Sequence, residues 1–154
     1  QATLGSQDNV EIYAIIGAFG AQDGVPVFSS GGSVTYLVQH EFSHSYVNPW
    51  VEKNEGELKK YAALYEPIKE AMQKQAYGNW TTTVHEHIVR AITLRLAYQR
   101  QQEAGDLVLK NEEARGFKYV RALAEKLKAY EAARNKYPTI TDFFPDLIQV
   151  FKPL

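Results

Sequence analysis

Two histidines and a glutamate between residues 40 and 44 have the types and spacing of a hydrolytic metal site. The run His40-Glu41-Phe42-Ser43-His44 has the pattern His-Glu-x-x-His. A helix advances about 100° and 1.5 Å per residue, so His40 and His44 lie about 40° apart and about one turn along the axis. Both imidazoles can then reach one metal ion. Glu41 lies beside the pair, where its carboxylate can take a proton from a metal-bound water.

A third ligand is needed, because a catalytic zinc ion is held by three protein ligands and keeps a fourth position for water. Cysteine is absent, which leaves histidine, aspartate and glutamate as candidates. The chain has four histidines, and the second pair, His85 and His87, flanks Glu86. We therefore expect the third ligand to come from residues 85–87. The alternative without chemistry is a pair of structural histidines that share one helix face.

Helical spacing alone leaves the third ligand open. The more apolar stripe contains His85, so that His85 could point inward, whereas Glu86 shares a more polar stripe with Arg90. Arg90 could hold the Glu86 carboxylate in place, or it could simply form an ion pair along the helix. The His85 stripe includes Val89, Ile92 and Leu96, and the Glu86 stripe includes Val89, Arg90, Thr93 and Ala97.

Together these motifs resemble the zincin metallopeptidases, specifically the gluzincin branch, where the first helix carries His-Glu-x-x-His and a later helix donates a glutamate. The resemblance covers His40, Glu41, His44 and, by its position in the later helix, Glu86. It implies one Zn²⁺ ion held by His40, His44 and Glu86, with Glu41 as the catalytic base. It also implies a peptide or protein substrate and a Tyr or His that stabilises the oxyanion. Tyr119 is a candidate for the last role.

The chain is also similar to uncharacterised bacterial families that are assigned to the metallopeptidases. They carry His-Glu-Phe-x-His followed by Asn-Pro, and Glu-x-x-Val-Arg-Ala further along. The corresponding segments here are residues 40–44, Asn48-Pro49 and residues 86–91. One departure from the zincins is that several strands usually precede their motif helix, whereas this sequence predicts one or two.

The expected fold is α+β and mostly helical: a zincin-like domain with short N-terminal strands and a bundle of about five or six helices, with His-Glu-x-x-His on the first. Asn48-Pro49 should end that motif helix, because proline lacks the amide hydrogen and restricts the preceding residue. Asn48 would then cap its end, with contact to the metal site as the alternative use. Patterning predicts strands at 10–16 and 25–28 and helices at 55–65, 67–77, 81–103 (closed by Gly105), 111–135 (capped at Asn111) and 139–151.

Composition indicates an ordinary globular protein. At 154 residues, 45% hydrophobic and with a formal net charge of −1, the chain fits one domain spanning residues 1–154. Basic runs are absent, which argues against nucleic acid, and no apolar run is long enough for a membrane span. The missing initial Met suggests a portion of a longer protein. Together with the lack of cysteine, it also suggests export to the periplasm or the cell exterior.

Three classes of function fit these observations. The first is a zinc-dependent peptide hydrolase that uses a metal-bound water activated by Glu41. The second is a metal-dependent hydrolase of a non-peptide amide or ester, which would use the same ligands with a different pocket. The third is a non-catalytic binding domain with the same fold. The general base Glu41 argues against the third class, because a purely structural metal site has no use for it.

Overall fold

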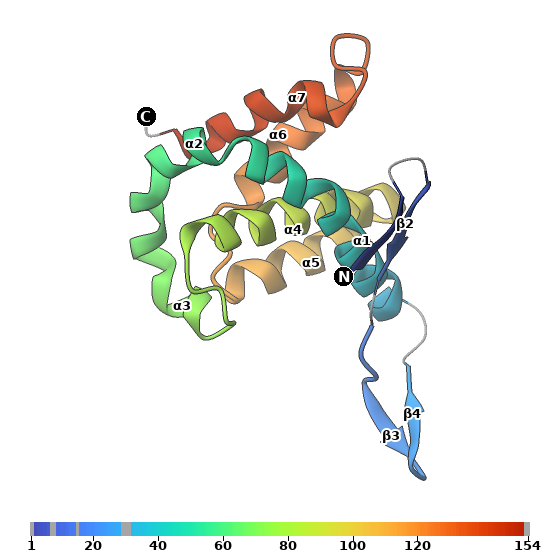
Figure 1. The fold of residues 1–154 in the computed structure, drawn as a ribbon. Helices are drawn as coiled ribbons and strands as arrows, with labels where there is room; N and C mark the ends of the chain where they lie inside the picture. The colour runs from blue at the N-terminus through green and yellow to red at the C-terminus, as the bar shows by residue number, and fades with distance from the viewer. Residues whose placement is uncertain (1, 7–8, 15, 29–31, 153–154) are drawn as a thin grey trace. The chain divides into compact units, whose positions relative to one another are not determined.

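The computed structural model describes residues 2–6, 9–14, 16–28 and 32–152 (Figure 1). Short strands come first and helices follow, which confirms the predicted α+β, mostly helical class. Contacts group the chain into two compact units, Gln1–Tyr46 and Val47–Leu154. Within the described ranges, every helix is too short or too polar to cross a lipid bilayer.

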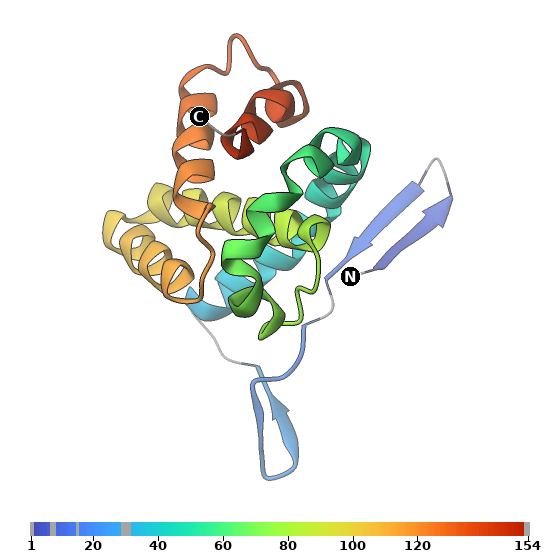
Figure 2. The same cartoon turned by 90° about the vertical axis from the view of Figure 1, so that its left-hand side faces the viewer.

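The strands of the first unit form two antiparallel hairpins (Figure 2). Strand β1 (Ala2–Ser6) pairs with β2 (Asn9–Tyr13), and β3 (Gly20–Gln22) pairs with β4 (Val25–Val27). The predicted strand 10–16 thus ends at Tyr13, and its residue 15 lies outside the described ranges. Strands β1 and β3 were not predicted. The second hairpin turns at Asp23-Gly24, where both residues have positive φ, a conformation that glycine adopts without strain.

The motif helix is longer than predicted. Helix α1 runs from Gly32 to Lys53 with Pro49 inside it, so the predicted end at Asn48-Pro49 is wrong and Asn48 does not cap the helix. Packing explains the difference, because Val47 and Val51 on either side of the proline are fully buried. Proline removes one backbone hydrogen bond, and the burial of the flanking turns offsets that loss. His40 and His44 therefore lie in the middle of a helix.

The next segment is helical from residue 55 to 73 with a change of type inside it. Helix α2 (Glu55–Leu58) leads into a 3₁₀ stretch, η1 (Lys59–Ile68), and then into α3 (Lys69–Gln73). The break predicted near Pro67 is therefore a tightened helix and not an interruption. Helix α4 (Trp80–Arg100) follows, and the Asn79 side chain caps it by accepting a hydrogen bond from the Thr82 amide.

The predicted helices 81–103 and 111–135 are divided differently in the structure. A single extended residue, Gln101, separates α4 from α5 (Gln102–Ala114). Gly105 does not close a helix but lies within α5, where a Cβ atom would be 2.1 Å from the Tyr98 ring. Asn111 belongs to the end of α5, and Gly116, with φ of 92°, turns the chain toward α6 (Val120–Ala132).

The final helix begins where the sequence predicts it. Thr139 and Asp142 form a reciprocal capping box at the start of α7 (Ile140–Leu147), and the 3₁₀ stretch η2 (Ile148–Phe151) completes it. The core of the second unit surrounds α4, which packs against α5 and α6 (Figure 1). Its largest fully buried side chains include Phe117, Phe144, Phe151, Met72, Ile88 and Leu94.

Candidate metal centre

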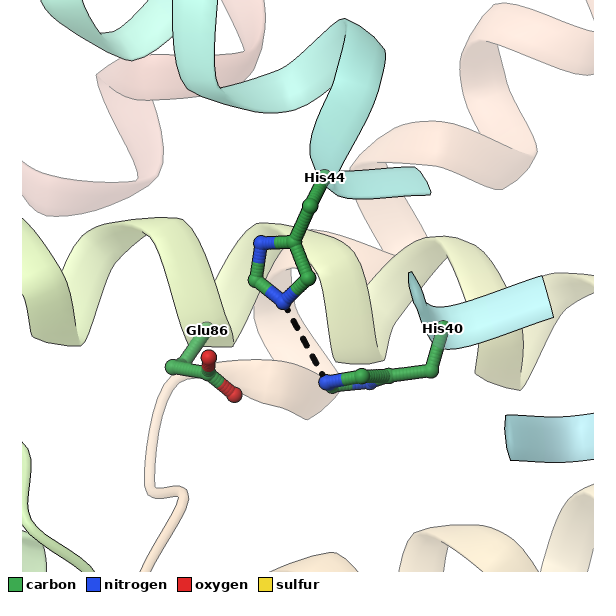
Figure 3. Close-up of side chains that lie close together, drawn as sticks. All are labelled: His40, His44 and Glu86. Atoms are coloured by element: carbon green, nitrogen blue, oxygen red, sulfur yellow. Dashed lines mark hydrogen bonds between the residues drawn. The ribbon is translucent and has the colours of Figure 1, made fainter. Parts of the chain in front are cut away.

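Helix α1 directs the two histidines of the motif toward each other. The Nε2 atoms of His40 and His44 lie 3.3 Å apart, and the ring centroids are 5.0 Å apart with the planes nearly perpendicular (Figure 3). His40 is buried and His44 is half-buried. The spacing follows from the helix itself, because residues four apart are neighbours on its surface.

Glu86 on α4 completes a group of three. His40, His44 and Glu86 each offer one ligand atom, and these atoms all lie within 4.8 Å of one another (Figure 3). Glu86 is 7% exposed. The structure thus brings together His40, His44 and Glu86, the three residues for which the sequence predicts a metal-binding role.

The donor set and its spacing fit a zinc ion. Two imidazole nitrogens and one carboxylate oxygen are a ligand set found in catalytic zinc sites. Two nitrogens bound at about 2.0–2.1 Å in a tetrahedron lie about 3.3–3.4 Å apart, and the two Nε2 atoms here are 3.3 Å apart. The ligand oxygen of Glu86 lies within 4.8 Å of the ligand nitrogens of His40 and His44.

Two buried charged residues lie near Glu86: Arg90 on the same helix and Glu112 on α5. The Arg90 guanidinium donates from Nη2 to Glu86 Oε2 at 3.1 Å and from Nη1 to both carboxylate oxygens of Glu112 at 3.0 Å. Nη2 also donates to the Tyr77 hydroxyl at 3.2 Å. The Phe117 ring lies 4.1 Å from the guanidinium carbon. Arg90 is therefore the ion-pair partner of Glu86 along the helix and also holds the carboxylate in place.

The polar stripe of α4, which contains Glu86 and Arg90, is the more buried of the two stripes. The apolar pattern favoured the His85 stripe as the one that faces inward. Ile92 and Leu96 on the His85 stripe are only half-buried, whereas Glu86 and Arg90 are less than a tenth exposed. Burial is possible because two carboxylates neutralise the guanidinium and share its hydrogen bonds. Thr93 and Ala97 continue the same buried stripe.

The histidines beside Glu86 do not join the candidate ligands. His85 is half-buried and is not in the group formed by His40, His44 and Glu86. His87 is fully buried, and its Nδ1 donates to the Thr83 carbonyl at 2.7 Å. Burial lowers the pKa of His87 to about 4, so the ring is neutral near pH 7. His87 is thus a core residue that lies next to the candidate ligand in the sequence.

Two expectations about supporting residues change. The Tyr119 hydroxyl donates to the Leu64 carbonyl at 2.7 Å and its ring packs against Trp80, so Tyr119 is a packing residue. Glu112, which follows the predicted cap residue Asn111, is instead buried within α5 beside Arg90. A signal for Glu112 existed: Gly105, Leu109 and Glu112 share one face of α5 at helical spacing, and all three are buried.

Tyr77 was not singled out from the sequence. Its hydroxyl meets Arg90, and burial followed by the nearby Glu86 carboxylate raises the pKa of Tyr77. The phenol therefore stays protonated at neutral pH and can donate a hydrogen bond to its acidic surroundings.

Glu41 lies on α1 beside the two histidines. It follows His40 directly in the sequence and is half-buried. Helical geometry places it about 60° around the axis from His44. The helix therefore presents the two imidazoles and an adjoining carboxylate over little more than one turn.

Neither a curated protein nor a solved structure matches the chain. One family model does match, and it covers residues 3–150, nearly the whole sequence. The match includes every candidate ligand and Glu41. The chain belongs to the family described as "Domain of unknown function (DUF4932)".

Proposed function

We propose that this protein is a zinc-dependent hydrolase of peptide bonds, with His40, His44 and Glu86 as the metal ligands and Glu41 as the general base. The observation that carries the proposal is the approach of the three ligand atoms to within 4.8 Å of one another. The resemblance of the same residues to the gluzincins supports peptide as the substrate. Zinc is the metal best suited to this donor set, although other divalent ions bind such nitrogen and oxygen sites.

In the proposed reaction the protein transfers one proton, which Glu41 carries. A bound divalent cation supplies Lewis acidity, which polarises a carbonyl oxygen and acidifies a water molecule. Glu41 accepts a proton from water as the water oxygen bonds to the carbonyl carbon. The protonated Glu41 then donates that proton to the departing nitrogen as the carbon–nitrogen bond breaks. The products are a carboxylic acid and an amine, and Glu41 returns to its ionised form.

The substitution Glu41→Gln tests this role because it removes the base and keeps the size of the side chain. We expect the variant to bind zinc as the wild type does and to lose about 10²–10⁴-fold in turnover, the usual contribution of a general base. Hydrolysis would be followed with a mixture of unstructured peptides, and products would be identified by mass spectrometry. Glu52→Gln, an exposed carboxylate on the same helix, is the matched control.

Unchanged turnover in Glu41→Gln would refute the proposed mechanism. Cleavage of simple esters or non-peptide amides, with every peptide left intact, would keep the metal chemistry but reject the substrate. Loss of zinc in Glu41→Gln would instead show that Glu41 holds the metal centre together.

A further inference from the structure

The charge around Glu86 is arranged in a chain that reaches α5. The side chains of Arg90 and Glu112 are 5% and 4% exposed, and that of Glu86 is 10% exposed. Arg90 makes one hydrogen bond to a single oxygen of Glu86 and one to each oxygen of Glu112. One guanidinium nitrogen, Nη1, thus contacts Glu112, and the other, Nη2, contacts Glu86.

An arginine beside a metal ligand has two opposing effects. Its hydrogen bond fixes the carboxylate, which favours coordination because less side-chain freedom is lost on binding. Its positive charge, however, repels a divalent cation at short range, and burial strengthens that repulsion. Glu112 supplies a full negative charge on the far side of Arg90. The pair Arg90–Glu112 therefore keeps the orienting hydrogen bond while its net charge is zero.

Neighbouring groups hold the guanidinium in one orientation. The Phe117 ring stacks 4.1 Å from its carbon, and the Tyr77 hydroxyl accepts a hydrogen bond from the same nitrogen that contacts Glu86. Arg115 contacts Glu112 Oε2 at 3.4 Å from the exposed side. The guanidinium is thus held by a ring that packs against its face and by hydrogen bonds from two of its nitrogens. None of these contacts requires a bound metal ion.

We propose that Arg90 and Glu112 are positioning residues of the metal centre: Arg90 orients Glu86, and Glu112 cancels the charge that Arg90 would otherwise direct at the cation. The inference rests on the proposed metal site and is independent of the reaction carried out there. It assigns α5 a role in metal affinity although α5 contributes no ligand.

The first test is Glu112→Gln, with Glu113→Gln as its matched control. Glu113 is the next residue on α5, and both of its carboxylate oxygens accept hydrogen bonds from Arg121 on the exposed surface. We expect Glu112→Gln to weaken zinc affinity by about 10–100-fold, as the loss of a residue that orients a ligand does. Glu113→Gln should bind within about twofold of the wild type. Affinity would be measured by competition with a chromogenic chelator.

The second test separates positioning from folding. The double variant Arg90→Met, Glu112→Met replaces a buried ion pair by apolar groups, which commonly leaves a protein as stable or more stable. Thermal unfolding of the metal-free proteins would check that it folds. We expect zinc affinity to remain about 10–100-fold reduced even so, since Glu86 has lost its orienting donor. The visible absorption of bound Co²⁺ should also change, because it reports the ligand set.

The outcomes distinguish the two proposals. Wild-type affinity in Glu112→Gln, or in the folded double variant with an unaltered Co²⁺ spectrum, would overturn the positioning role and leave the metal centre standing. A wild-type protein that binds no zinc would overturn both. Equal weakening in Glu113→Gln would show a general charge effect and would also overturn the positioning role.

Discussion

Two arginines on α4 each contact both carboxylate oxygens of a glutamate on a neighbouring helix, Arg90 from Nη1 alone and Arg95 from Nε and Nη2, and the two pairs have different surroundings. Arg90 joins Glu112 on α5 at 3.0 Å to both oxygens, and Arg95 joins Glu131 on α6 at 2.9 and 2.7 Å. The first pair is buried and carries Glu86 as a further partner. The second lies nearer the surface, with side chains 15% and 29% exposed, and its arginine faces the Tyr98 ring.

The difference indicates what each pair contributes. A pair near the surface links two helices and adds little to the free energy of unfolding. A buried pair removes two charges from water, and apolar residues in its place are often as stable. Stability alone therefore does not account for Arg90 and Glu112. The contact of Arg90 with the candidate metal ligand Glu86 supports the positioning role proposed above. The comparison of the two pairs can be tested one change at a time.

The largest difference is expected between Arg90→Met and Arg95→Met. Removal of Arg90 leaves Glu86 and Glu112 buried without their shared cation, and we expect a loss of about 3–5 kcal/mol in the free energy of unfolding. Arg95→Met should lose less than about 1 kcal/mol. Urea unfolding with a chelator present measures both. Equal losses in the two variants would contradict the contrast.

The glutamates paired with these arginines, Glu112 and Glu131, should differ in the same direction in their effect on the free energy of unfolding. Glu112→Gln leaves Arg90 with one buried carboxylate instead of two, and we expect a loss of about 1.5–3 kcal/mol, typical of hydrogen bonds to charged groups. Glu131→Gln should lose below about 1 kcal/mol. The comparison uses the same urea titration, and a Glu131→Gln variant as destabilised as Glu112→Gln would refute the distinction between the pairs.

The C-terminal half of α4 packs closely against α5 at Tyr98 and Gly105. A Cβ atom on Gly105 would lie 2.1–2.4 Å from atoms of the Tyr98 ring, so Gly105→Ala must displace that ring. We expect it to destabilise the fold by about 1–3 kcal/mol, as overpacking does, with zinc affinity unchanged. Gly78→Ala, where nothing lies within 4 Å, is the control. Thermal unfolding of both variants decides whether the contact is steric.

Tyr77→Phe should have the smallest effect of the series. It removes the hydroxyl that accepts from Arg90 at 3.2 Å and keeps the ring against Phe117. We expect a loss of about 0.5–1.5 kcal/mol, the net value of one hydrogen bond. A variant as damaging as Arg90→Met in urea would show that the phenol, and not the guanidinium, organises the buried charge.

Helical periodicity accounts for what the sequence predicted about the site. The spacing of His40 and His44 fixes their approach wherever the helix forms, because four residues make about one turn. Glu86 was selected through a resemblance, since its own stripe is polar and patterning favoured the more apolar stripe of His85. The His85 stripe is the more exposed one: Ile92 and Leu96 are half-buried, and Ile92 packs against the core from there, whereas an arginine neutralised by carboxylates can be buried.

The missed features depend on contacts between distant segments. Pro49 lies inside α1 because the buried valines around it outweigh one lost hydrogen bond, and the local sequence does not reveal that burial. Gly105 has the signature of a helix end, yet its small size admits the Tyr98 ring. Glu112 faces Arg90 only because the chain reverses at the single extended residue Gln101. Local propensity cannot supply such tertiary information.

The most direct test of the metal centre is the zinc content of the purified protein after exhaustive dialysis, measured by elemental mass spectrometry beside His44→Ala and Glu86→Ala. We expect about one zinc per wild-type chain and loss of that zinc in both variants. Zinc retained in Glu86→Ala would remove Glu86 from the ligand set. No zinc in the wild type, or equal zinc in all three proteins, would contradict the proposed metal centre.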